Sequence, residues 1–314
     1  MDMGSIKTVV VVGGPTAVGK TSIAIELAKS YGTEIISADS RQCFKELIIG
    51  VARPTLEQLN SVPHHFIGSH SIHQKVTAAT FEHYALQKTE QLFKNNDVIV
   101  MVGGTGLYIK AFCEGLDEIP DVPEDIRNEI VEHYFQYGLN WLHDELNKVD
   151  PHFLTVGETK NPHRLMRALE VVRATGHSIL TYRKGIKAER SFRVIKLALE
   201  LPKDELHRNI NHRVDQMMEE GLLEEVQSLI PYQHINALQT VGYKELFDYY
   251  KGQVTLPDAV ENIKVHTRQY AKRQLTWFRK DKEYSWFSPN EVQKIKEHLK
   301  DALVNYDGSS GFKI

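Results

Sequence analysis

The chain has 314 residues, 41% hydrophobic and 25% charged with a net charge of −3, a balance typical of a globular protein rather than a disordered or fibrous one. No stretch approaches the roughly 18 apolar residues of a membrane-spanning helix, and the opening residues, MDMGSIKTVVVVGG, lack the pattern of a secretory signal. Two cysteines, Cys43 and Cys113, exclude a disulfide framework and fit a reducing compartment. We therefore expect a cytoplasmic protein without membrane contact.

The first hundred residues predict strands that alternate with helices. Residues 7–12 are a β-branched run that ends in two glycines, which is typical of a central parallel strand buried on both faces. We expect a helix over 21–31, a strand over 34–38, a helix over 78–95 and a strand over 97–102. This alternation predicts a parallel sheet with ligands at the carboxyl ends of its strands.

A phosphate-binding motif follows the first predicted strand. The sequence GPTAVGKT matches G-x-x-x-x-G-K-[ST] in full and stands between a predicted strand and a predicted helix, as the motif requires. Its backbone N–H groups and the helix N-terminus would bind phosphate oxygens, Lys20 would neutralise them, and the Thr21 hydroxyl would be a ligand of Mg²⁺. We expect a di- or triphosphate, ATP included, to bind Gly14, Pro15, Thr16, Ala17, Val18, Gly19, Lys20 and Thr21.

An acidic residue at the end of the second predicted strand is a candidate for chemistry. The later strand VIVMVGGT carries its acid, Asp97, at the beginning, so it lacks the strand-end carboxylate common in ATPases. Asp39 instead leaves its strand beside the phosphate loop. It could be a metal ligand, a general base or the cap of the next turn.

The second half of the chain predicts a change from sheet to helices. The segment 119–190 has helical patterns and no convincing strand, and 192–201 then restores a strand. Helices are expected over 203–220, 222–229 and 256–279.

These elements predict an α/β fold, namely a P-loop NTPase-like parallel sheet core with a helical insertion domain. Residues 1–118 and 191–314 would form the core with its C-terminal helices, and 119–190 the insertion. The residues from 306 onward are expected to be a loose tail.

Charge is distributed unevenly. The net charge is −9 over residues 114–150, +7 over 160–193 and +6 over 264–282. The two basic segments could follow a phosphate backbone, or they could be solvated helix faces. His64, His65, His70 and His73 have no carboxylates or cysteines at ligand spacing, so we do not expect a metal site there.

Six segments occur in the order found in one enzyme family. They are GPTAVGKT at 14–21, ISADSRQ at 36–42, GGTGLY at 103–108, NPHRLMRALEV at 161–171, VGYKE at 241–245 and AKRQLTWFR at 271–279. On these motifs the chain resembles bacterial-type tRNA dimethylallyltransferases, also called tRNA isopentenyltransferases. The resemblance implies a prenyltransferase that moves a dimethylallyl group from dimethylallyl diphosphate to N6 of the adenosine 3′ of the anticodon and releases diphosphate. It also implies the tRNA anticodon stem-loop as partner. We expect Mg²⁺ as cofactor and a monomer, and we infer no obligate protein partner; the sequence does not show the oligomeric state.

The resemblance assigns roles to individual residues. Catalysis would involve Asp39 as the base, Lys20, Thr21, Thr105 at the edge of the donor site, and Arg213 beside the departing diphosphate. Contacts with tRNA would come from Asp39, Ser40, Arg41, Gln42, Thr105, Arg127, His163, Arg164, Leu165, Met166, Arg167, Gln239, Thr240, Val241, Gly242, Tyr243, Lys244, Lys272, Arg273, Gln274, Leu275, Thr276, Trp277, Phe278 and Arg279.

The chemistry of prenyl transfer requires the same groups. An allylic diphosphate reacts by losing diphosphate, so N–H groups, a lysine, Mg²⁺ and an arginine that stabilise the leaving charge would promote it. The exocyclic amine of adenine is a poor nucleophile, so a carboxylate such as Asp39 is expected to take its proton.

Several alternatives stay open. An adenylate isopentenyltransferase would share the phosphate loop without an anticodon clamp, and a P-loop kinase would move the γ-phosphate of ATP to a small molecule. The basic segments favour tRNA. Trp277 and Phe278 could stack on a base or belong to the core. Cys43-Phe44 and Asn209 depart from the family pattern, which leaves the pocket wall and one phosphate contact in question.

Overall fold

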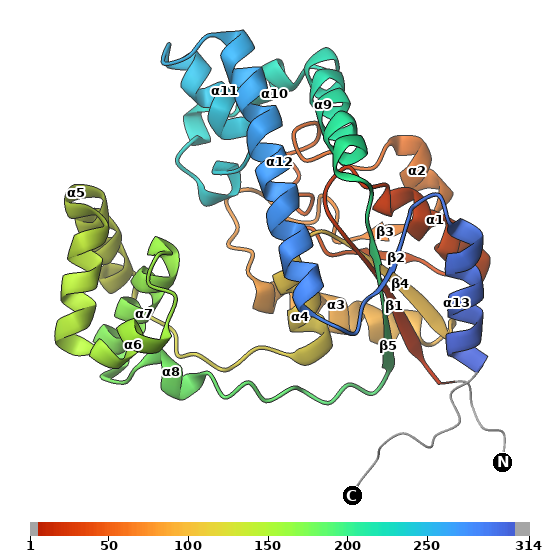
Figure 1. The fold of residues 1–314 in the computed structure, drawn as a ribbon, viewed down its shortest axis with the longest axis horizontal. Coiled ribbons are helices and arrows are strands. Elements are labelled where there is room, and N and C mark those ends of the chain that lie inside the picture. The colour runs from red at the N-terminus through yellow and green to blue at the C-terminus, as the bar shows by residue number, and fades with distance from the viewer. Residues whose placement is uncertain (1–5, 305–314) are drawn as a thin grey trace, which may run out of the picture. The chain divides into compact units, whose positions relative to one another are not determined.

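A parallel sheet forms the centre of the structure. The computed structural model describes residues 6–304, and within this range the strands form one six-stranded sheet in the order β3-β2-β4-β1-β5-β6 (Figure 1). All neighbouring strands are parallel. The strands are β1 (Thr8–Gly13), β2 (Ile35–Ser37), β3 (His64–His65), β4 (Val98–Val102), β5 (Arg193–Leu199) and β6 (Ser285–Phe287). The predicted strands are therefore confirmed, and the sheet has two further short edge strands, β3 and β6, which the sequence did not predict.

β1 lies in the middle of the sheet because it is apolar on both faces. It pairs with β4 on one side and with β5 on the other, and Val9, Val10, Val11 and Val12 are fully buried. Val9 and Val11 belong to one core cluster, which also contains Phe81 and Tyr108, whereas Val10 and Val12 belong to the other. A strand of this kind fixes the phosphate loop that follows it to the rigid centre of the fold.

Helices cover both faces of the sheet. They are α1 (Lys20–Tyr31), α2 (Leu56–Ser61), α3 (Ala78–Leu92), α4 (Gly106–Glu114), α9 (Lys203–Glu219), α10 (Leu222–Ser228), α11 (Tyr243–Tyr250), α12 (Leu256–Lys280) and α13 (Val292–Val304), with 3-10 turns η1 (Ile230–Tyr232) and η2 (Asn236–Leu238). The predicted helices are confirmed, and α2, α4, α11 and α13 are additional. α12 packs beside α9 and runs toward α4 (Figure 1). No helix between residues 6 and 304 is long and apolar enough to cross a membrane.

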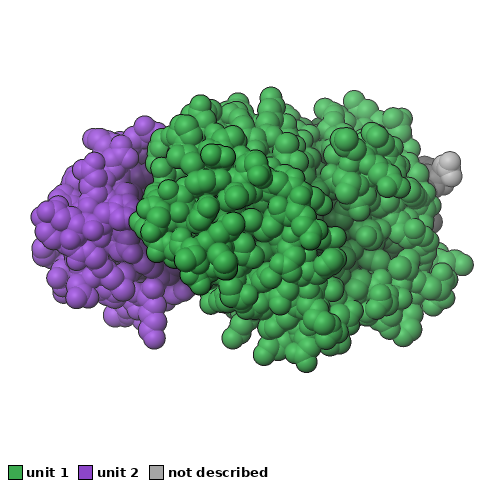
Figure 2. All heavy atoms as spheres, turned by 90° about the horizontal axis from the view of Figure 1, so that it is seen from above, with its two compact units in different colours: residues 1–113, 189–314 green, residues 114–188 purple. Residues whose placement is uncertain are grey.

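The chain divides into two compact units. Unit 1 comprises residues 1–113 and 189–314, and unit 2 comprises residues 114–188 (Figure 2). Unit 2 is helical, with α5 (Glu124–Val149), α6 (Pro151–Val156), α7 (Pro162–Thr175) and α8 (Ile179–Tyr182) around a core of its own. The expected α/β fold with a helical insertion is therefore confirmed. The expected loose tail lies outside the described residues.

The chain leaves and re-enters unit 1 at neighbouring points. At the border of unit 2, the Ala188 N–H donates to the Glu114 carbonyl at 2.7 Å. In unit 1, Arg190 Nε donates to the Phe112 carbonyl at 2.8 Å, and Arg190 Nη2 pairs with Glu82 at 2.7 Å. The two crossing segments are thus held next to each other.

Candidate active site

Three loops meet at the carboxyl ends of β1, β2 and β4. The Thr105 N–H, after β4, donates to the carbonyl of Ala38, after β2, at 3.2 Å, and the Ser40 N–H donates to Thr105 Oγ1 at 3.0 Å. Gly103 permits this approach, because a Cβ at that position would lie 2.1 Å from the Ala38 carbonyl oxygen. Thr105 and Asp39 are therefore brought together as the motifs implied.

The phosphate loop has the backbone that its sequence predicts. Gly14 and Gly19 have φ values of 138° and 96°, in the region that favours glycine, and Ala17 has a φ of 63°. A Cβ on Gly14 would also lie 2.8 Å from the Leu199 carbonyl oxygen of β5. Lys20 Nζ lies over the loop and donates to the Pro15 carbonyl at 2.6 Å.

Two cations lie beside this loop without carboxylate partners in contact. Burial of Lys20 lowers its pKa from 10.5 to about 7; Arg213 lowers it further, while Asp39 opposes the shift. Arg213 Nη1 donates to Thr16 Oγ1 at 3.3 Å, and burial also lowers the pKa of Arg213. Neither side chain forms an ion pair within the described part of the chain, so this edge of the sheet is suited to an anion.

Asp39 both caps a turn and keeps an oxygen available. Its Oδ1 accepts the N–H groups of Arg41 and Gln42 at 2.8 and 3.2 Å. Among residues 6–304 no donor reaches its Oδ2. The capping and general-base interpretations are thus compatible, because one oxygen orients the carboxylate and the other can take a proton.

Tyr270 of α12 is a neighbour of Asp39 that the sequence analysis missed. Burial and the negative charge of Asp39 raise the pKa of the Tyr270 phenol to about 12, and Arg273 lies 5.8 Å from its ring centroid. Its spacing of four residues from Gln274 on one helix would have indicated a shared face.

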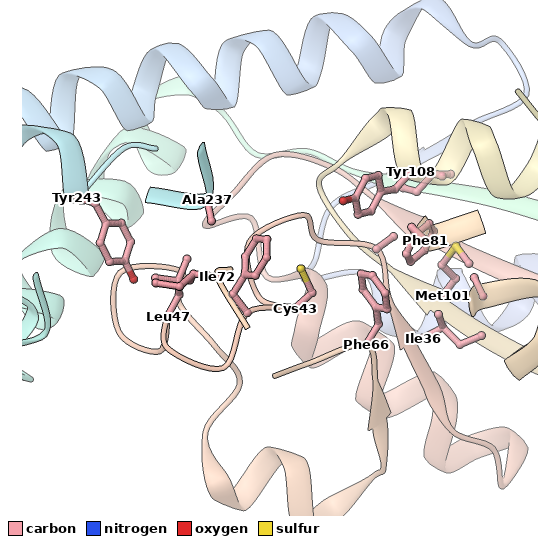
Figure 3. Close-up of a cluster of buried hydrophobic side chains, with 14 of the residues drawn as sticks. Ile36, Cys43, Leu47, Phe66, Ile72, Phe81, Met101, Tyr108, Ala237 and Tyr243 are labelled. Atoms are coloured by element: carbon pink, nitrogen blue, oxygen red, sulfur yellow. The ribbon is translucent and has the colours of Figure 1, made fainter. Parts of the chain in front are cut away.

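A second missed residue, Glu225 of α10, shapes the loop after the ISADSRQ motif. Its carboxylate accepts the N–H groups of Ile48, Ile49 and Gly50 at 3.1, 2.8 and 3.1 Å, and the Tyr243 hydroxyl donates to it at 2.6 Å. Figure 3 shows Tyr243 in the buried cluster that also contains Leu47 and Ile72. Burial and then Glu225 raise the pKa of Tyr243. Nothing in the sequence pattern indicated Glu225, because the backbone groups that it binds lie 175 to 177 positions away along the chain.

The side chains expected to touch tRNA separate into outward and buried groups. Outward side chains are His163, Arg164, Gln239, Lys244, Lys272, Arg273, Thr276, Trp277 and Arg279, while Ser40, Arg41, Gln42, Arg127, Arg167, Thr240, Val241 and Leu275 are half-buried. Leu165, Met166, Tyr243, Gln274 and Phe278 are buried. Leu165, Tyr243 and Phe278 are at most 1% exposed, and their side chains fill core clusters. The expected contacts of their segments with tRNA stay predictions.

The two neighbouring aromatic residues of α12 have different environments. Phe278 packs in the core, where a Cβ on Gly13 would lie 2.7 Å from its ring. Trp277 is 39% exposed and packs over Gly106, where a Cβ would lie 2.1 Å from the indole. Only Trp277 of this pair offers a surface on which a base could stack.

The basic segment of unit 2 is largely paired with acidic residues. Arg173 binds Glu129 and Glu145 at 2.9 and 2.7 Å. Glu170 pairs with Arg127 and Arg167 at 3.5 and 3.1 Å. The charges of the 114–150 and 160–193 segments therefore cancel in part, and the binding of tRNA phosphates by the basic segment stays a prediction.

Asn209 and Cys43, which depart from the family pattern, and Thr21, the expected Mg²⁺ ligand, have defined surroundings in the structure. Asn209 Nδ2 donates to the Ala17 carbonyl at 3.4 Å, so this side chain braces the phosphate loop. Cys43 is buried, and its pKa is raised to about 12 by burial, so its thiol is neutral. Thr21 is half-buried at the start of α1, and its hydroxyl has no hydrogen bond in the range 6–304. That hydroxyl and the free Asp39 oxygen are the hard oxygen donors that Mg²⁺ prefers.

Comparisons with known proteins agree on one family. The family model described as IPP transferase matches residues 42–281. The chain is 44% identical over 293 residues to tRNA dimethylallyltransferase 1 of Bacteroides thetaiotaomicron, with 93% of this chain and 95% of that protein covered. It is 46% identical over 281 residues to tRNA dimethylallyltransferase of Christiangramia forsetii, with coverage of 90% and 93%.

Solved structures have the same fold. The tRNA isopentenylpyrophosphate transferase of Bacillus halodurans superposes with a TM-score of 0.70 at 35% identity, covering 95% of this chain and 97% of that one. A eukaryotic dimethylallyltransferase acting on tRNA has a TM-score of 0.77 at 24% identity, covering 95% of this chain and 80% of that one, which shows similarity of fold.

Proposed function

We propose a reaction for this chain, which belongs to the IPP transferase family. It transfers a dimethylallyl group from dimethylallyl diphosphate to N6 of the adenosine 3′ of the anticodon in tRNA and releases diphosphate. The observation that supports the proposal is that the phosphate loop and Asp39 lie together at the carboxyl ends of β1 and β2. The names of the relatives support the acceptor and the transferred group.

The phosphate loop would bind the diphosphate of the donor. The residues for this are Gly14, Pro15, Thr16, Ala17, Val18, Gly19, Lys20 and Thr21, with Arg213 beside Thr16. As the allylic carbon–oxygen bond breaks, its electron pair stays on the diphosphate, and Lys20 and Arg213 stabilise the added charge. A Mg²⁺ ion held by the Thr21 hydroxyl would neutralise part of the same charge when bound.

Asp39 would serve the other side of the reaction. The adenine N6 forms its bond to the allylic carbon, and the proton that N6 loses passes to the free Oδ2 of Asp39. Thr105 holds the Ser40 backbone at 3.0 Å and so keeps the Asp39 turn in place. The carbon–oxygen bond of the donor and one N–H bond of adenine break, while a carbon–nitrogen bond and an O–H bond on Asp39 form.

The tRNA would contact outward polar groups of both units. In unit 1 these are Lys272 and Arg273 of α12, with the exposed ring of Trp277 on the same helix and the half-buried Arg41 and Gln42 near Asp39. In unit 2 they are His163 and Arg164 at the start of α7. Cationic groups of this kind bind phosphates and fix register, while the extruded adenine can stack on an aromatic ring.

The proposal includes the setting in which the protein acts. We place it in the cytoplasm, where its tRNA substrate occurs, as a monomer. The phosphate loop also has the chemistry to bind the phosphates of ATP, so ATP is expected to compete with the donor rather than to react.

The test is a nucleoside mass analysis of undermodified tRNA after incubation with the protein, Mg²⁺ and dimethylallyl diphosphate. An adenosine in the anticodon loop that is heavier by one dimethylallyl group supports the proposal. A product with AMP and none with tRNA would indicate a free-nucleotide enzyme. Transfer of phosphate from ATP, with no prenyl product, would indicate a kinase.

A further inference from the structure

The side chain of Gln274 joins two loops of the site. Gln274 lies on the buried face of α12 with Ala271 and Phe278 and is 6% exposed. Its Oε1 accepts the Thr16 N–H at 2.9 Å, and its Nε2 donates to the Gly104 carbonyl at 2.9 Å. A buried amide with both ends paired to backbone has one orientation, because a flip would set donor against donor and acceptor against acceptor.

The two partners of Gln274 belong to opposite sides of the reaction. Thr16 is part of the phosphate loop, and its hydroxyl also accepts from Arg213 at 3.3 Å. Gly104 precedes Thr105, whose hydroxyl accepts the N–H of Ser40, the residue after Asp39. A continuous path of bonds therefore runs from the leaving-group site through Gln274 to the turn of the general base.

We infer that Gln274 is a positioning residue that sets the spacing between the departing diphosphate and Asp39, an inference that rests on the proposed function. Its side-chain amide is committed to Thr16 and Gly104, so this residue acts through the two loops rather than as the tRNA contact that its motif implied. Displacement of reacting groups by about 1 Å can lower a rate by roughly 10²-fold. The effect of losing Gln274 therefore falls on kcat, while the affinity for tRNA is left nearly unchanged.

The first test is Gln274→Glu. This variant keeps the size of the side chain and the acceptor for Thr16, but it replaces the donor to Gly104 with an oxygen that repels the carbonyl. We expect kcat to fall by about 10²-fold, with tRNA affinity within about threefold of wild type. Gln227→Glu on the exposed face of α10 makes the same change of charge and should keep wild-type kinetics.

The second test addresses the same link from the other end. A Cβ at Gly104 would lie 2.3 Å from Gln274 Nε2, so Gly104→Ala pushes the amide away without altering Gln274. If both changes break one link, the double variant Gly104→Ala/Gln274→Ala should be no slower than the slower of the single variants Gly104→Ala and Gln274→Ala. Circular dichroism checks that each variant is folded, and Gly104→Ala carries the test if Gln274→Glu is not.

The outcomes separate this inference from the proposed function. If the wild-type protein forms no prenylated adenosine, the proposed function fails and the inference fails with it. If wild type is active and Gln274→Glu keeps kcat within about threefold, the inference alone is overturned. A roughly tenfold loss of tRNA affinity at unchanged kcat, or effects of the two single changes that multiply in the double variant, would also overturn it.

Discussion

The phosphate-loop edge of unit 1 and the α5–α7 helices of unit 2 use charged side chains in opposite ways. In unit 1, Lys20 and Arg213 donate to a carbonyl and a hydroxyl of the phosphate loop, and their charges have no carboxylate in contact among the described residues. In unit 2, Arg173 binds two glutamates directly. Charge that the fold leaves without a counterion is available to a ligand, whereas paired charge serves mainly to hold helices together.

The largest effect is expected when the carboxylate of Asp39, beside the phosphate loop, is removed. Asp39→Asn keeps an oxygen to accept the Arg41 and Gln42 N–H groups but removes the basic carboxylate. We expect the single-turnover rate of prenyl transfer to fall by about 10³-fold, with tRNA affinity within about twofold. Near-normal turnover in this variant would exclude Asp39 as the base.

The next effect concerns the unpaired lysine. The pKa of Lys20 in the ligand-free site is about 7, so its positive charge is lost as the pH rises through that value. At pH 6, Lys20→Met should bind inorganic diphosphate roughly 10²-fold more weakly than wild type does. Above pH 7 this difference should shrink, because the wild-type lysine loses its charge and wild-type affinity decreases. Titration calorimetry at several pH values measures both, with Lys29→Met on the exposed side of α1 as control.

The same lysine predicts a pH dependence of stability. In the unfolded chain Lys20 keeps its ordinary pKa of 10.5, so unfolding takes up a proton between about pH 7 and 10.5. The contribution of Lys20 to the free energy of unfolding should therefore rise with pH across this window and be lost in Lys20→Met. Urea unfolding at pH 7 and 9 measures the change in the free energy of unfolding for each protein. An equal change in wild type and Lys20→Met would contradict the prediction.

A smaller effect is expected at the paired charges of unit 2. Arg173→Met keeps the apolar stem near Trp141 but removes the cation that joins Glu129 to Glu145, and Glu145 then keeps Lys148 as its partner at 2.7 Å. We expect a loss of about 1–2 kcal/mol in the free energy of unfolding, mainly from the charged hydrogen bond to the half-buried Glu145, because Glu129 is exposed. Urea unfolding checks this, and diphosphate binding should not change. A stability unaltered by this change would contradict the structural role of the pair.

The smallest effect is expected at an outward arginine of the same unit. Arg164 pairs with Glu158, and both side chains are about half exposed, so Arg164→Gln should alter stability by less than about 0.5 kcal/mol. If Arg164 contacts a phosphate, tRNA affinity should fall severalfold, and the salt dependence of log K should flatten by about 0.7–0.9. An unchanged salt slope would remove Arg164 from the interface.

Sequence and structure agree where local pattern decides the outcome. The buried strand of valines, the phosphate loop and the aspartate after β2 follow from hydrophobic runs and motif spacing, and all three are found. β3 and β6 were missed because two- and three-residue edge strands carry no periodicity. The roles of Gln274 and Glu225 depend on partners about 170 and more positions away, which no local pattern encodes. The pairing in unit 2 was missed because counting charges does not show which helix faces which.

The hydrogen bond between Ala188 and Glu114 has a consequence for how such a chain can be altered. The polypeptide leaves and re-enters unit 1 through two segments held side by side, and Arg190 is fixed to the Phe112 carbonyl. Unit 2 is therefore an insertion whose two connecting segments lie next to each other. A short turn of a few residues could join these two segments directly without moving any strand. The sheet and its phosphate loop could then be produced without unit 2, and a different helical domain could be inserted in its place.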